Sequence, residues 1–177
     1  MTYSRRRARE SALQILYGLD WEAGDAEFAI EDYWIKFAGE KPEGYQDVRN
    51  HCSELVRGVV RERNAIDLRL QATAQHWKLD RMSAVDRNIL RMAAYELLYM
   101  GDSVPKSVAI NEAIEIAKKF GNEDSSAFVN GVLDRVGQSR APTVADEAAD
   151  RVRAANKRRF AKAKAAKAGA KPGPAAP

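Results

Sequence analysis

Apolar residues in the first part of the chain recur with the period of an α-helix. Ala12, Ile15, Leu16 and Leu19 follow the i, i+3, i+4, i+7 spacing that places side chains on one helical face. The spacing therefore predicts an amphipathic helix over about 4–22.

The same periodicity predicts the other elements. Further helices are expected over 25–38, from 45 into the low 60s, over a short stretch around 66–77, and over 83–100, 105–120 and 124–137. No segment shows the sustained alternation that is typical of a half-buried strand. The pattern predicts an all-α bundle of about seven helices, forming one domain within residues 1–140.

Residues 141–177 differ in composition from the rest. Fourteen of these 37 residues are alanine, and nine Lys or Arg outnumber three acidic residues. This basic tail has too few apolar side chains to dock firmly, so we expect it to be partly helical or disordered.

Charge is divided unevenly along the chain. The net charge is +4, yet residues 10–140 carry −6 and the tail carries +6. Four arginines at the N-terminus supply the remaining positive charge. Such a distribution indicates a polyanionic partner.

Composition excludes several classes of protein. A single cysteine cannot form a disulfide framework, and two histidines make a zinc site unlikely to be complete, so we expect no metal and no cofactor. There is no run of 18 apolar residues and no apolar stretch behind the N-terminal arginines, so we expect neither a membrane span nor a signal peptide. The predicted location is the cytoplasm.

The sequence offers little for catalysis. It contains no glycine-rich phosphate loop and none of the common hydrolase motifs. His51 and Cys52 are adjacent, and adjacent helical positions point about 100° apart, which suits a nucleophile–base pair poorly. We expect no enzyme; a hydrolase that uses Cys52 is the alternative to be tested.

The N-terminal arginines form the strongest charge feature. Arg5, Arg6, Arg7 and Arg9 lie within five residues. Guanidinium groups bind phosphate through paired hydrogen bonds and stack on bases. Because cations at a helix N-terminus oppose the helix dipole, local stability does not explain them, and we expect them to bind a nucleic-acid backbone.

A second cluster lies at the joint between the last two predicted helices. Charge, aromatic rings and hydrogen-bonding groups gather there, as in proteins that bind single-stranded RNA. The candidate RNA contacts are Lys119, Phe120, Asp124, Ser125, Phe128 and Asn130. We expect this joint and the arginine-rich helix start to form a single cradle for unpaired nucleotides.

The helix around residues 83–100 carries polar residues at or near its apolar stripe. Glu96 follows Ile89 by seven positions, so it lies near that stripe and needs a partner, for which Arg87, Arg91 and Asn111 are candidates. Asp86 on the same helix could instead belong to a protein-docking surface.

Four segments together resemble the NusB family of transcription antitermination factors. They read RRRARESALQILY at 5–17, DRNILRMAAYEL at 86–97, VAINEAIEIAKKFG at 108–121 and FVNGVLD at 128–134. The resemblance covers about 5–137 and leaves the basic tail without a counterpart.

The resemblance implies two small helical subdomains and a heterodimer with NusE, a small-subunit ribosomal protein. The pair would bind single-stranded boxA RNA of ribosomal operon leaders and join the antitermination complex on RNA polymerase. It implies RNA contacts from 5–9, Phe120, Asp124, Ser125 and Phe128, and a NusE surface at or near Tyr17 and Asp86. The alternative is an accessory RNA-binding module allied to ribosomal RNA methyltransferases.

Overall fold

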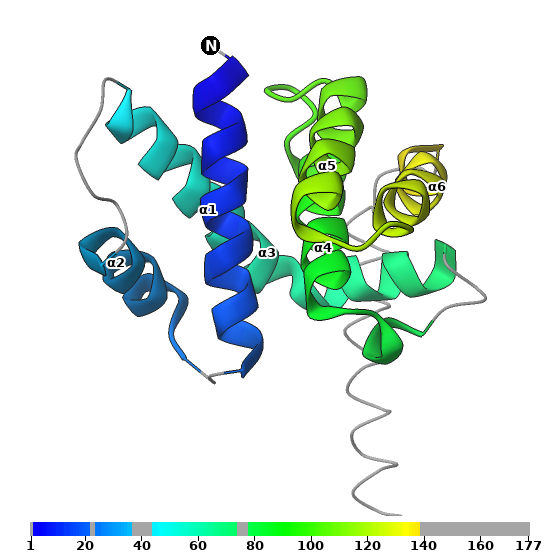
Figure 1. Ribbon diagram of the computed structural model, residues 1–177, viewed down its shortest axis with the longest axis horizontal. Coiled ribbons are helices and arrows are strands. Elements are labelled where there is room, and N and C mark those ends of the chain that lie inside the picture. The colour runs from blue at the N-terminus through cyan, green and yellow to red at the C-terminus, as the bar shows by residue number, and fades with distance from the viewer. Residues whose placement is uncertain (1, 22–23, 37–43, 74–77, 139–177) are drawn as a thin grey trace, which may run out of the picture. The chain divides into compact units, whose positions relative to one another are not determined.

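The computed structural model describes residues 2–21, 24–36, 44–73 and 78–138, with side chains from residue 5 onward. Six α-helices make up this part of the chain, with one short 3-10 turn and no strand (Figure 1). The helices are α1 (Thr2–Trp21), α2 (Ala26–Lys36), α3 (Tyr45–Thr73), α4 (Ala84–Tyr99), α5 (Lys106–Phe120) and α6 (Ser125–Gln138), with the turn η1 (Leu79–Arg81) before α4. The all-α prediction is confirmed.

Helix α3 corrects the predicted helix count. The third and fourth predicted helices form one continuous helix of 29 residues. No proline or glycine stands between Arg61 and Thr73, and buried Ile66 and Leu70 extend the apolar stripe of Val56 and Val59. Nothing in the local sequence therefore ends the helix. The end of the predicted fourth helix, including Trp77, lies outside the described residues.

The core is built around α3 and α4. Helix α3 contacts α1, α2, α4 and α6, and it passes behind α1 and α4 in Figure 1. Helix α4 is buried on nearly all sides, with every residue from Asn88 to Glu96 inside. The described residues belong to one compact unit, so α1 to α6 share a single core.

Close packing between the two central helices depends on Gly58. A Cβ atom at this position would overlap the ring of Tyr95 on α4. We expect Gly58→Ala to lower the free energy of unfolding by about 1–3 kcal/mol, since the core must shift to admit the methyl group. Urea denaturation would measure this. The matched control is Gly18→Ala in α1, where a Cβ meets nothing within 4 Å and a more stable protein is expected; equal effects at both glycines would contradict the explanation.

None of the described helices is long and apolar enough to cross a membrane.

Candidate nucleic-acid interface

The four N-terminal arginines point in different directions from α1. Arg5 and Arg7 are exposed, Arg6 is half-buried and Arg9 is buried. The sequence predicted a surface cluster of four, but the structure places only three of them where a ligand could reach.

Arg9 lies in the core, paired with Glu96 of α4. Its Nε is 3.0 Å from both carboxylate oxygens and its Nη2 is 2.7 Å from Oε1. The side chains are 2% and 1% exposed. This ion pair corrects two expectations: Arg9 is not on the expected RNA surface, and the partner of Glu96 is Arg9 rather than a residue of its own helix.

The two arginines expected to pair with Glu96 belong to another buried network. Arg87 and Arg91 both donate to Asp20, at 2.9 and 3.2 Å. Burial alone would raise the pKa of Asp20, but hydrogen bonds from Arg87 and Asn88 and the nearby arginine charges outweigh it and lower the pKa. This network ties the end of α1 to α4.

Arg6 reaches from α1 to Glu112 in the middle of α5. Its Nε and Nη2 donate to the two carboxylate oxygens, each at 2.8 Å. The Glu112 side chain is 7% exposed, while that of Arg6 is 42% exposed. The hydrogen bond from Arg6 lowers the pKa of Glu112. Sequence reasoning missed Glu112, because its partner is 106 positions away.

The Arg6–Glu112 pair makes stability depend on acidity. The pKa of Glu112 in the folded protein is below its ordinary value of 4.5. The ionised Glu112 therefore stabilises the folded protein fully above pH 4.5, and this contribution is lost as the pH falls through the folded-state pKa. We expect Arg6→Met to raise the pKa of Glu112 and to move acid unfolding, followed by circular dichroism, to higher pH. Lys36→Met, which breaks the exposed pair with Asp32, is the control and should leave the midpoint in place; coincident acid transitions for all three proteins would refute the prediction.

A second ion pair joins α1 to the end of α5. Lys119 Nζ is 2.8 Å from both oxygens of Glu10 and 5.1 Å from the centre of the Phe120 ring. The arginine-rich start of α1 and the joint after α5 therefore lie side by side, as the cradle hypothesis requires.

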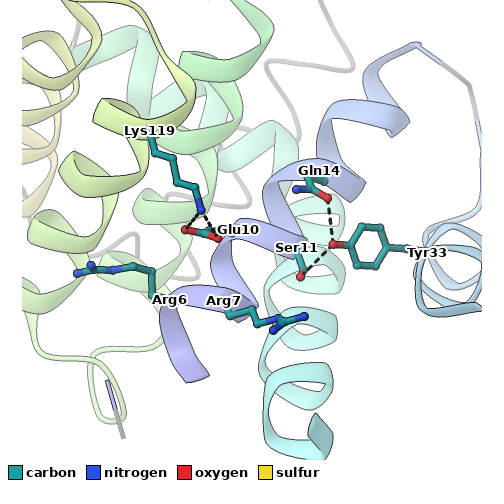
Figure 2. Close-up of a pocket in the computed structure, with 7 residues that line it drawn as sticks. All are labelled: Arg6, Arg7, Glu10, Ser11, Gln14, Tyr33 and Lys119. Atoms are coloured by element: carbon teal, nitrogen blue, oxygen red, sulfur yellow. Dashed lines mark hydrogen bonds and ion pairs between the residues drawn. The ribbon is translucent and has the colours of Figure 1, made fainter. Parts of the chain in front are cut away.

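An open cavity of about 420 Å³ lies over this region (Figure 2). Its walls come from three helices, α1, α2 and α5. The lining residues are Arg6, Arg7, Glu10, Ser11, Gln14, Tyr33 and Lys119. Figure 2 shows Arg6 and Arg7 extending to opposite sides of α1, with Lys119 descending from α5 onto Glu10.

Four of these lining residues were missed by sequence reasoning: Glu10, Ser11, Gln14 and Tyr33. The Tyr33 hydroxyl lies 3.1 Å from Ser11 Oγ and 3.0 Å from Gln14 Oε1. Arg7, Ser11 and Gln14 are spaced i, i+4, i+7, so a polar stripe along α1 was a readable signal. Tyr33 lies within the helix predicted over 25–38, and nothing in that pattern marked it as a site residue.

Apart from Lys119, the RNA contacts predicted at the joint do not line the cavity. Asp124 and Asn130 are exposed, and Phe120 and Phe128 are partly buried against the core. Ser125 is 2% exposed. Its hydroxyl accepts from the Asn122 amide at 2.9 Å, so it stabilises the joint and is not on the predicted surface.

The two predicted partner contacts differ in accessibility. Tyr17 is 42% exposed, next to an exposed Trp21. Asp86 is 8% exposed, and its carboxylate accepts from the Ser83 hydroxyl, which also caps α4 by accepting from the Asp86 amide. Asp86 therefore organises the start of α4 and presents little surface to a partner.

The structure argues against Cys52 as a nucleophile. The thiol is fully buried, and burial raises its pKa to about 12, so it is protonated at neutral pH. Among the described residues, no group of three His, Cys, Asp or Glu side chains is placed to hold a metal ion.

Comparisons with known proteins agree with the resemblance. The model of the NusB family matches residues 6–138. Transcription antitermination protein NusB of Anaeromyxobacter dehalogenans is 47% identical over 142 residues, which cover 80% of this chain and 96% of that protein. The protein of the same name from Geobacter sulfurreducens is 47% identical over 133 residues, covering 75% and 93%.

Solved structures share the fold. NusB of T. maritima aligns with a TM-score of 0.65 at 37% identity, covering 78% of this chain and 93% of that one. A chain from a crystal structure of antitermination factors NusB and NusE in complex with dsRNA aligns with a TM-score of 0.68 at 25% identity, covering 79% and 100%.

Proposed function

The chain belongs to the NusB family, and from this premise we propose that it is an RNA-binding transcription antitermination factor that acts as a heterodimer with NusE. The pair would bind boxA RNA in the leaders of ribosomal operons and help assemble the antitermination complex on RNA polymerase in the cytoplasm. The observation that carries the proposal is the cationic cradle between α1 and the end of α5, within a chain whose family match spans 6–138.

Charge and geometry support RNA as the ligand. Arg6, Arg7 and Lys119 line one cavity, and the Phe120 ring lies beside Lys119. Guanidinium and ammonium groups bind phosphates, and an aromatic ring at their edge can stack on a base. In this proposal the contacts are made by Arg5, Arg6, Arg7, Lys119 and Phe120, with Asp124, Phe128 and Asn130 extending the surface over the joint.

NusE is the partner that the solved relative in complex with NusE and dsRNA suggests. Residues 10–140 carry a net charge of −6, which would steer a basic ribosomal protein toward this chain. Exposed Tyr17, with Trp21 at a ring-centre distance of 6.1 Å, offers an aromatic contact for that partner.

The experiment is a binding assay with and without NusE. We expect the purified full chain with NusE to bind single-stranded boxA RNA more tightly than a scrambled RNA of the same length and composition. A duplex of the same boxA sequence shows whether the bases must be unpaired. Equal affinity for boxA and scrambled RNA would remove the proposal.

The basic tail is expected to add affinity without specificity. At +6, residues 141–177 attract any polyanion, and the family match ends before them. Deleting 141–177 should therefore weaken binding to boxA and to scrambled RNA by similar factors and leave their ratio unchanged. If the truncated protein binds boxA and scrambled RNA with equal affinity, the tail is responsible for the sequence discrimination.

A further inference from the structure

The side of the cavity that faces α2 carries neutral hydrogen-bonding groups in place of charge. There the Tyr33 hydroxyl oxygen lies 3.1 Å from Ser11 Oγ and 3.0 Å from Gln14 Oε1. Phosphate recognition alone does not require an amide at this position. Amide side chains, which carry both donors and an acceptor, can read the edge of a base.

Tyr33 sets the orientation of the Gln14 amide. The Tyr33 hydroxyl donates to Gln14 Oε1, which lies 3.0 Å from the hydroxyl oxygen. With its oxygen held by Tyr33, Gln14 turns its NH₂ group away from the tyrosine, as Figure 2 shows. Gln14, which lines the cavity, therefore offers its two N–H donors on the side away from Tyr33, and one of the two lone pairs of its oxygen is engaged.

Glu10 supplies an acceptor one helical turn earlier. Residues four apart on a helix are neighbours, with Cβ atoms about 5–6 Å apart. Each oxygen of Glu10 receives one contact from Lys119, which leaves part of the carboxylate's acceptor capacity unused. The cavity wall thus places a donor from Gln14 beside an acceptor from Glu10.

We propose that this cavity binds one unpaired keto base, uracil or guanine, in the RNA that the proposed function supplies. Both bases carry a carbonyl oxygen next to a ring N–H, which match the donor of Gln14 and the acceptor of Glu10. Cytosine and adenine present an exocyclic amino group and an unprotonated ring nitrogen, the opposite pattern. Arg7 lines the same cavity and binds the adjoining phosphate.

The test uses a panel of boxA RNAs in which the base at each position is replaced in turn by each of the other three. The affinity of the full chain with NusE for each RNA is measured by fluorescence anisotropy. The wild-type protein should show one position at which uracil and guanine bind better than cytosine and adenine by about tenfold. Gln14→Leu should reduce that preference to within about twofold and leave the preferences at other positions intact. Gln14→Glu, which replaces the donors by acceptors, should favour the amino bases there.

Gln71→Leu is the matched control, because Gln71 is an exposed glutamine on α3 outside the cavity. Tyr33→Phe is the second variant: it keeps the ring but frees the Gln14 amide to turn, so it should weaken the same preference even where Gln14→Leu folds poorly. A wild-type protein that discriminates boxA from scrambled RNA yet prefers keto bases at no position would overturn this inference alone. A keto preference that survives in both Gln14→Leu and Tyr33→Phe would also overturn this inference. If the wild-type protein does not discriminate boxA from scrambled RNA at all, the proposed function itself is removed.

Discussion

Glu96→Gln is expected to lower the free energy of unfolding by about 3–5 kcal/mol, the largest effect of any single change considered for this protein. The substitution keeps the shape of the side chain but leaves the guanidinium of Arg9, which is 2% exposed, without its buried counter-charge. Glu112 lies 3.9 Å from Arg9 Nη1 and compensates in part, which favours the lower end of that range. Urea denaturation followed by circular dichroism measures the change.

Two variants make this prediction specific. Glu54→Gln removes an exposed carboxylate of α3, and it should change stability by less than about 0.5 kcal/mol. The double variant Arg9→Met, Glu96→Leu replaces the whole pair by apolar side chains, and it should recover most of the loss because no unpaired charge remains. Wild-type stability in Glu96→Gln would show that the pair contributes nothing.

The same double variant separates the two roles considered for Arg9. If Arg9 acts only within the core, the folded double variant keeps its affinity for boxA RNA. If the double variant folds but loses RNA binding, Arg9 takes part in RNA binding, as the sequence alone predicted.

Replacing Arg7 and Lys119 together by glutamine is expected to have the largest effect on RNA binding. Both side chains line the cavity, and Lys119 is exposed enough for its loss to cost little stability. Each phosphate contact on a single strand contributes about 0.7 to the slope of log K against log salt, so the slope should become less steep by about 1.4. Affinity at low salt should fall at least about tenfold.

Salt titrations with the full chain and NusE provide the measurement. Lys36→Gln with Lys78→Gln removes the same charge from exposed positions on α2 and before η1, away from the cavity. This control should lose little affinity. An unchanged slope in the Arg7, Lys119 variant would mean that neither side chain contacts the RNA backbone.

The ion pairs at the candidate interface would affect RNA binding. Glu112 and Glu10 hold Arg6 and Lys119 in place in the free protein. Such contacts reduce the side-chain entropy lost on binding, but phosphate must then compete with a carboxylate for each cation. Arg5 and Arg7, which are exposed and form no ion pair with the described residues, are the cations most readily available.

Local sequence was sufficient for most of the helices and for the two regions that form the candidate interface. The period of apolar residues in α1, α5 and α6 depends on neighbours along the chain, and so does the concentration of arginine at the start of α1. The continuation of α3 beyond Arg61 could also have been predicted from the local sequence, because no residue between Arg61 and Thr73 ends a helix.

The burial of Arg9 also has a signal in the sequence. Arg9 precedes Ala12 by three positions and Leu16 by seven, which places it on the apolar face of α1, just as Glu96 follows Ile89 by seven on α4. Two opposite charges on two apolar stripes need partners, and each is the partner of the other.

The sequence by itself determined that this chain folds into amphipathic helices with a cationic start and a polar, aromatic joint, because periodicity and charge are properties of neighbouring residues. Only the tertiary structure decided which cations remain accessible, which carboxylates hold them, and that Tyr33 completes the cavity. Those contacts join residues up to 109 positions apart, and helix packing, which no local pattern encodes, brings them together.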